Sequence, residues 1–235
     1  MRAAPPVRED HSVGRVAAAG VIFDLDGVLI DSIVPVTAAI NEALVEHGLA
    51  PRPAAELRRF IGPPVFMAFG ELTGKPAGSA AVAAIVATYR ARYTERYLTQ
   101  TKLFDGVLPM LAELSARVPL AIATSKSTSF TQPLLDALGL SRYFAVVAAA
   151  AADDVADDKT AIVARALAGL RRSPVAMVGD RSFDIVAAHA HSLFAIGVTW
   201  GIGSREELRA AGADRLVERQ SDLIEMLQSE REQIS

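Results

Sequence analysis

Short apolar runs alternate along the chain with longer segments in which apolar residues recur at helical spacing. The short runs show little alternation of apolar and polar positions, which is typical of strands covered on both faces of a parallel sheet. The pattern predicts six such strands, at 20–24, 119–124, 144–147, 174–178, 193–198 and 214–217.

Segments of helical period separate these strands and predict helices at 107–116, 130–138, 160–168, 183–190, 206–210 and 223–228. A regular succession of strand and helix favours a parallel sheet with helices on both of its faces. We therefore expect the α/β fold class, with a doubly wound and mostly parallel sheet.

The interval between the first two predicted strands breaks this rhythm, because about ninety residues there contain no strand pattern. Helical periods occur instead at 36–47, 54–60, 65–72 and 80–98. Residues 33–101 are therefore expected to form a small helical domain inserted after the first strand. The main domain then consists of residues 16–32 and 102–235, and residues 1–15 are expected to be a flexible tail.

Composition narrows the choice of function. The chain has 235 residues, of which 51% are hydrophobic, so it can build a substantial core. A net charge of -3 argues against nucleic acid as a partner. The absence of cysteine excludes disulfides and cysteine-based zinc sites, and fits a cytoplasmic location. The longest apolar stretch, 143–152, is much shorter than the about 20 residues of a membrane span, so no membrane partner is expected.

Polar residues collect where the predicted strands end, and open parallel sheets bind ligands at that edge. Asp24 and Asp26 end the first strand, and Thr124 and Ser125 end the second. Two further carboxylates and a lysine complete the set, namely Asp180, Asp184 and Lys159.

Crowded carboxylates need a cation, because two unit charges about 4 Å apart repel by about 4 kcal/mol at an effective dielectric of about 20. An all-oxygen ligand set favours Mg²⁺ over zinc, and Mg²⁺ commonly shares its remaining positions with substrate phosphate. We predict a magnesium site at Asp24, Asp26, Asp180 and Asp184, and phosphate binding by Thr124, Ser125 and Lys159.

Structural roles compete with these functional ones. The Asp24–Asp26 pair could cap a turn, and Asp180 and Asp184 could cap a helix. Lys159 at a helix start opposes the helix dipole, which favours an anionic partner over a purely structural role. The main-chain N–H groups of Ser125 and Lys126 are candidates for binding phosphate, and Lys126 is equally compatible with a solvated position.

The succession of these motifs resembles the haloacid dehalogenase superfamily of phosphohydrolases. Residues 24–32 match its first motif, 123–126 the second, Lys159 the third and 179–185 the fourth. The resemblance extends over nearly the whole chain from about residue 20, and the helical insert lies where that family places its cap domain.

A finer resemblance points to phosphoglycolate phosphatases and their close relatives, through residues 61–64, 198–204, 206–208 and 211–214. These relatives include nucleotidases and proteins reported to act on protein tyrosine. The alanine and aspartate residues at 149–154 depart from the family pattern around the third motif.

The resemblance implies Mg²⁺-dependent hydrolysis of a phosphomonoester, on a small phosphorylated metabolite such as phosphoglycolate. Asp24 would attack phosphorus to form an aspartyl phosphate, and Asp26 would serve as general acid and base. The metal ligands would be the Asp24 carboxylate, the Asp26 main-chain carbonyl and Asp180, with Asp184 in support.

Several rival functions remain open at this stage. A nucleotidase, a sugar-phosphate mutase and a protein-tyrosine-directed enzyme all fit the motifs. Asp26 disfavours a haloalkanoate dehalogenase, because the dehalogenases that the chain resembles lack this carboxylate. A regulatory binding module is the non-enzymatic alternative, and the intact motif positions disfavour it. The sequence carries no signal for an oligomeric state.

Overall fold

The computed structural model describes residues 15–151 and 157–227. The expected flexible tail therefore lies almost wholly outside the described residues, as do residues 152–154 of the divergent segment 149–154. Within the described part, no helix has the length and apolar character needed to cross a membrane.

One parallel sheet of six strands forms the centre of the main domain, in the order β5-β4-β1-β6-β7-β8. Its strands are β1 (Gly20–Phe23), β4 (Leu120–Ser127), β5 (Phe144–Ala150), β6 (Val175–Gly179), β7 (Phe194–Val198) and β8 (Arg215–Val217). The chain builds outward from β1 on one side and then on the other, which confirms the predicted doubly wound α/β fold. The point of reversal, beside β1, is where such sheets bind ligands.

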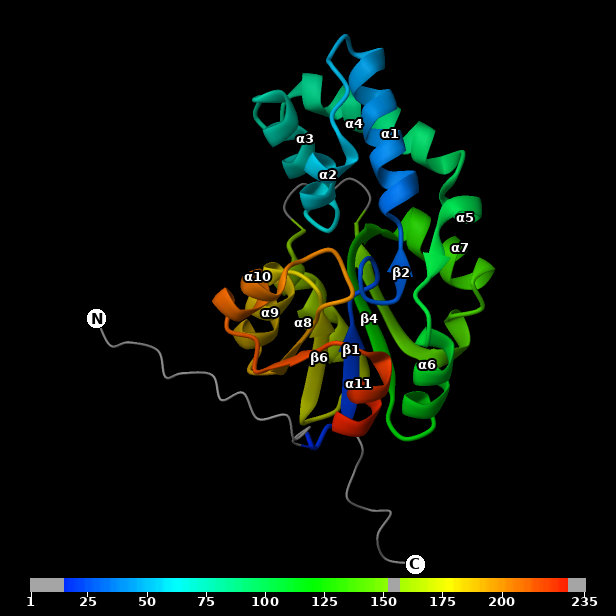
Figure 1. Ribbon diagram of the computed structural model, residues 1–235, viewed down its shortest axis with the longest axis vertical. Helices are drawn as coiled ribbons and strands as arrows, with labels where there is room; N and C mark the ends of the chain where they lie inside the picture. The colour runs from blue at the N-terminus through cyan, green and yellow to red at the C-terminus, as the bar shows by residue number, and fades with distance from the viewer. Residues whose placement is uncertain (1–14, 152–156, 228–235) are drawn as a thin grey trace, which may run out of the picture.

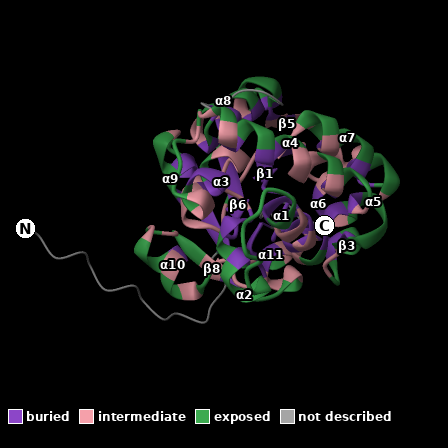
Figure 2. Cartoon of the chain, turned by 90° about the horizontal axis from the view of Figure 1, so that it is seen from above, coloured by how far each residue is buried: buried purple, intermediate pink, exposed green. Residues whose placement is uncertain are grey.

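Successive residues of β1 face opposite layers, since Val21 and Phe23 belong to one apolar cluster and Ile22 to another. Helices α6 (Val107–Ser115), α7 (Thr128–Ala137) and α11 (Gln220–Met226) cover the first face. Helices α8 (Lys159–Leu170), α9 (Ser182–Ala190) and α10 (Arg205–Ala210) cover the second face (Figure 1). In the view from above, buried residues gather around β1 and β6 while the outer helix surfaces are exposed (Figure 2).

Two short strands that the sequence pattern did not predict mark the root of the insert. The chain leaves the main domain through β2 (Ile30–Asp31) and returns through β3 (Lys102–Leu103), and these two strands pair antiparallel. Strands of two residues are too short to show a period of hydrophobicity, which explains why the pattern missed them.

Only helices lie between β2 and β3 in this fully described stretch of the chain. They are α1 (Ile33–Glu46), α2 (Ala54–Leu57), the 3₁₀ helix η1 (Arg58–Phe60), α3 (Val65–Thr73), α4 (Ala80–Thr94) and α5 (Tyr97–Gln100). This helical group, called the cap below, lies over the carboxyl ends of the sheet strands (Figure 1). The domain boundaries at 33 and 101 stay a prediction.

Candidate active site

Three carboxylates from two strand ends meet beneath the cap. Asp24 follows β1, Asp180 follows β6, and Asp184 lies in the first turn of α9. One carboxylate oxygen of each residue lies within 4.8 Å of the others. All three are buried, with 3% of Asp24 and 0% of the other two exposed. The structure thus brings together three of the four predicted metal-ligand side chains.

Close backbone approach allows Asp180 to reach this position. A Cβ atom at Gly27 would lie 2.1 Å from Asp180 Oδ2, and one at Gly201 would lie 2.5 Å from the same oxygen. Gly27 also has a φ of +86°, which disfavours side chains. The main-chain N–H of Ile202 donates to Asp180 Oδ2 at 2.6 Å, which fixes the carboxylate.

The two carboxylate oxygens of Asp184 have different partners. Its Oδ2 accepts hydrogen bonds from the main-chain N–H groups of Asp180 (3.2 Å) and Arg181 (3.1 Å), so it caps the start of α9. Its Oδ1 lies 2.9 Å from Lys159 Nζ. One oxygen, Oδ2, thus caps the helix, and the other, Oδ1, is the one available for the predicted role in the site.

Lys159 begins α8, and its buried ammonium points toward the carboxylates. Its Nζ lies 2.6 Å from Asp24 Oδ1 as well as close to Asp184. Burial disfavours the charged form, yet the carboxylates of Asp184 and Asp24 raise the pKa of Lys159 above its usual value. A lysine at a helix start was expected to have an anionic partner, and Asp24 and Asp184 are such partners.

Two carboxyl groups of the cluster have raised pKa values, which shows that the negative charge is not fully balanced. Burial raises the pKa of Asp24 to about 7, with Asp184 and Asp26 contributing and Lys159 opposing. Burial and the charge of Asp184 also raise the pKa of Asp180 well above its usual value. Among the described residues, Asp180 Oδ1 has no hydrogen-bond partner, while Asp184 Oδ1 lies beside the Lys159 ammonium. A buried oxygen without a donor, in an all-oxygen set, fits a Mg²⁺ ion.

Asp26 lies beside this cluster rather than in it. Its Oδ1 accepts a hydrogen bond from Ser32 Oγ and lies 3.1 Å from Lys126 Nζ. Ser32 and Lys126 therefore hold the Asp26 carboxylate on the side of the site that faces the pocket. The main-chain carbonyl of Asp26 remains a predicted metal ligand.

Two of these contacts were not foreseen from the sequence. The side chain of Lys126 is only 7% exposed, so the interpretation of it as solvated is wrong. Its ammonium also donates to the hydroxyl of Tyr93, on cap helix α4, at 2.8 Å. Ser32 precedes α1 but makes no capping hydrogen bond with its side chain, because that hydroxyl binds Asp26 instead.

Two of the residues predicted to bind phosphate, Thr124 and Ser125, lie in the second half of β4. Thr124 is buried and its Oγ1 accepts from the main-chain N–H of Lys126 at 3.2 Å. Thr124 and Ser125 line a pocket together with Asp24 and Asp26. Both residues thus line the pocket beside Asp24, and their role in binding a phosphoryl group stays a prediction.

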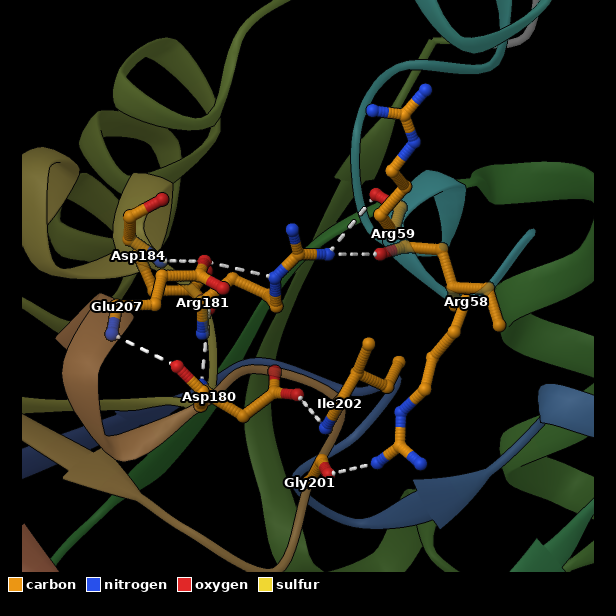
Figure 3. A network of polar contacts seen from close by, with 11 residues as sticks. Arg58, Arg59, Asp180, Arg181, Asp184, Gly201, Ile202 and Glu207 are labelled. Carbon is orange, nitrogen blue, oxygen red and sulfur yellow. Dashed lines mark hydrogen bonds and ion pairs between the residues drawn. The ribbon is translucent and has the colours of Figure 1, made fainter. Parts of the chain in front are cut away.

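Polar contacts connect the cap to the site-bearing loops (Figure 3). The Arg58 guanidinium donates to the carbonyl oxygen of Gly201 at 2.6 Å. From the opposite direction, Arg181 donates to the carbonyl oxygens of Ile61 (2.8 Å) and Arg59 (3.3 Å). The side chain of Arg181 is 11% exposed. This arginine, adjacent to Asp180, therefore contacts the cap rather than solvent.

Comparison with known proteins assigns the class that fold and site define. A family model described as haloacid dehalogenase-like hydrolase matches residues 21–198, and the chain belongs to that family. It is 34% identical over 221 residues to a phosphoglycolate phosphatase of Pectobacterium atrosepticum, covering 90% of this chain and 93% of the relative. The resemblance to the phosphoglycolate-phosphatase-like group is thereby confirmed.

The chain is also similar to another named relative and to a solved structure. The chain is 41% identical over 187 residues to the tyrosine-protein kinase PtkA of Mycobacterium tuberculosis, covering 78% of this chain. It spans only 62% of the length of that relative. Among solved structures, a predicted phosphatase from Clostridium acetobutylicum superposes with a TM-score of 0.84 at 29% identity, covering 89% of this chain and 98% of the other.

Proposed function

We propose that the protein is a Mg²⁺-dependent phosphomonoester hydrolase that acts on small phosphorylated metabolites through an aspartyl-phosphate intermediate. The observation that carries this proposal is the placement of the Asp24 carboxylate. It lies between the buried carboxylates of Asp180 and Asp184 and a pocket lined by Asp26, Thr124 and Ser125. Membership in a hydrolase family with a relative named phosphoglycolate phosphatase supports it further.

Each carboxylate on the pocket side has a distinct task. A bond forms between an Asp24 oxygen and phosphorus while the ester P–O bond breaks, and Asp26 gives its proton to the leaving oxygen. Asp26 then takes a proton from a water molecule, whose oxygen attacks phosphorus. This second displacement frees Asp24 and releases inorganic phosphate.

The remaining residues balance charge. The carboxylates of Asp24 and Asp180 and the Asp26 carbonyl would hold Mg²⁺, with Asp184 in support, and the ion supplies charge neutralisation between nucleophile and phosphate. Thr124, Ser125 and Lys159 provide the donors for phosphoryl oxygens. Phosphoryl transfer depends mainly on such positioning and charge stabilisation.

The cap excludes water from the reaction. It covers the strand ends that carry the site, and its side chains form the wall of the pocket opposite Asp24. Closing such a lid over bound substrate protects the phosphoenzyme and brings the leaving group into contact with the cap.

A phosphate-release assay tests the proposal directly. The protein with Mg²⁺ and a generic aryl phosphate is expected to release phosphate, and Asp24→Asn is expected to abolish release because the amide is not a nucleophile. Circular dichroism of the variant checks that the fold is retained. Substantial residual turnover by Asp24→Asn would rule out Asp24 as the nucleophile.

The same assay distinguishes the proposed hydrolase from the alternative functions. A mutase would form an isomer without net phosphate release, and a binding module would show no Mg²⁺-dependent turnover. A panel with phosphoglycolate, nucleoside monophosphates and phosphotyrosine distinguishes a metabolite phosphatase from a nucleotidase and from a tyrosine-directed enzyme.

A further inference from the structure

The pocket beside Asp24 has walls of opposite character. It has a volume of about 100 Å³ and lies between the strand ends and the cap. On the sheet side it presents the polar groups of the site. On the cap side it is lined by apolar and aromatic side chains from three helices, among them Val36, Ile40, Phe66, Phe69, Tyr89 and Tyr93.

The aromatic side chains form one connected array. The rings of Phe69 and Tyr89 lie 5.5 Å apart, and those of Tyr89 and Tyr93 are stacked at 5.7 Å with an interplanar angle of 12°. The ring of Phe130, from α7 of the main domain, meets Tyr93 edge-on at 5.0 Å. These separations and angles are those at which aromatic rings attract one another, and all four side chains also line the pocket.

The tyrosine hydroxyl groups of this wall are neutral. Burial raises the pKa of both Tyr89 and Tyr93, so their hydroxyls stay neutral at physiological pH. The Tyr93 hydroxyl already accepts a hydrogen bond from Lys126, whose ammonium is paired with Asp26. The Arg90 guanidinium lies over the Phe66 ring at 5.6 Å, so this pocket cation lies against an aromatic face.

We propose that the substrates are aromatic phosphate monoesters whose leaving alcohol carries a single ring. This inference rests on the proposed function and names the substrate class of that same site. With the phosphoryl group at Asp24, the leaving oxygen points toward the cap, and a ring attached to it enters the apolar array. The pocket volume of about 100 Å³ is below the about 150 Å³ of an apolar cavity that can hold one benzene molecule, so a leaving group larger than one ring does not fit.

Benzyl phosphate and ethyl phosphate form the decisive pair of substrates, because both leave as alkoxides of similar basicity and differ mainly in the ring. We expect kcat/KM for benzyl phosphate to exceed that for ethyl phosphate and for phosphoglycolate by about tenfold or more. Equal values, or a preference for phosphoglycolate, would overturn the proposal.

Substitutions at two neighbouring positions of α3 test whether the pocket wall causes the preference for benzyl over ethyl phosphate. Phe66→Ala is expected to reduce the benzyl-to-ethyl ratio about tenfold, while Phe66→Leu keeps bulk and tests whether the ring itself matters. Met67→Ala is the matched control, because Met67 is on the same helix and 55% exposed. A ratio that stays unchanged in Phe66→Ala contradicts the assignment.

A binding measurement separates this inference from the proposed function. If the protein hydrolyses no phosphomonoester, the proposed function fails, and calorimetry with benzylphosphonate and ethylphosphonate still tests the pocket. At least tenfold tighter binding of benzylphosphonate supports the inference, and equal binding overturns it. Free phosphotyrosine and a phosphotyrosine peptide then distinguish a free metabolite from a protein side chain as the source of the ring.

Discussion

Asp24 couples the chemistry of the site to the stability of the fold. Burial raises its pKa from 3.8 to about 7, and the charges of Asp184 and Asp26 add to the effect although Lys159 opposes it. The folded chain therefore holds this proton more tightly than the unfolded chain does. A proton bound more tightly in the folded state makes stability fall as pH rises from the unfolded pKa to the folded one.

The expected fall in stability with rising pH can be tested with metal-free protein. In EDTA, Asp24→Asn is expected to gain stability relative to the wild type as the pH rises from about 4 to about 7, because the amide avoids the buried charge. Urea unfolding at about pH 5 and about pH 8 measures the difference. Asp105→Asn, at an exposed position, serves as control. A difference between Asp24→Asn and wild type that stays constant across this range would contradict the raised pKa.

The candidate residues differ in how far sequence alone could find them. Asp24 and Asp180 follow buried apolar runs, so the rule that parallel strands end at one edge was enough to bring them together. Lys126 and Ser32 gave no such signal. Their contacts with Asp26 depend on the turn between β1 and β2 and on the position of the cap, and no local pattern encodes either.

At the scale of elements, long periodic segments were predictable and short ones were not. The buried strands and the cap helices α1 and α3 lie close to their predicted ranges, because burial imposes a period on their sequences. The single helix predicted at 80–98 is instead divided into α4 and α5. The pair β2–β3 escaped prediction since its two-residue strands are defined by hydrogen bonding alone. These strands nevertheless determine where the cap departs from the main domain.

The cap is held in two chemically different ways. On the α7 side its contact is aromatic, with Tyr93 and Tyr97 packed edge-on against Phe130. On the α9 side its contact is polar, through the hydrogen bonds that Arg181 donates to the carbonyl oxygens of Ile61 and Arg59. Because polar contacts can exchange with water more readily than apolar packing can, we expect the cap to open on the Arg181 side.

Replacing Arg181 tests this expectation. Arg181→Ala removes two hydrogen bonds to cap carbonyl oxygens and leaves the Arg58–Gly201 bond in place. It is expected to lower kcat/KM about tenfold, the loss for one charged hydrogen bond of about 1.5 kcal/mol. Hydrogen exchange at 59–61 should become faster. Arg219→Ala is the control, since that side chain is 76% exposed and pairs only locally with Asp222. Unchanged exchange at 59–61 in Arg181→Ala would show that the cap is held without this residue.

Across the whole molecule, one apolar cluster runs from the sheet face covered by α6, α7 and α11 into the cap. The carboxylate cluster lies at the end of the sheet beneath the cap, where buried negative charge opposes folding. The same network that would bind Mg²⁺ is thus a source of instability when no cation is present. Metal binding should therefore appear as a gain in stability of the complete fold.

Mg²⁺ at about 100 times its dissociation constant is expected to raise the free energy of unfolding by about 2.7 kcal/mol, because the unfolded chain has no assembled site. The gain should increase with pH, since bound Mg²⁺ displaces the protons that the raised pKa values of Asp24 and Asp180 retain. Urea unfolding with Mg²⁺ or EDTA measures it. Asp180→Asn should lose the gain, and the exposed Asp105→Asn should keep it. A wild-type protein that Mg²⁺ does not stabilise would exclude the three-carboxylate site, because binding to the folded state alone requires stabilisation.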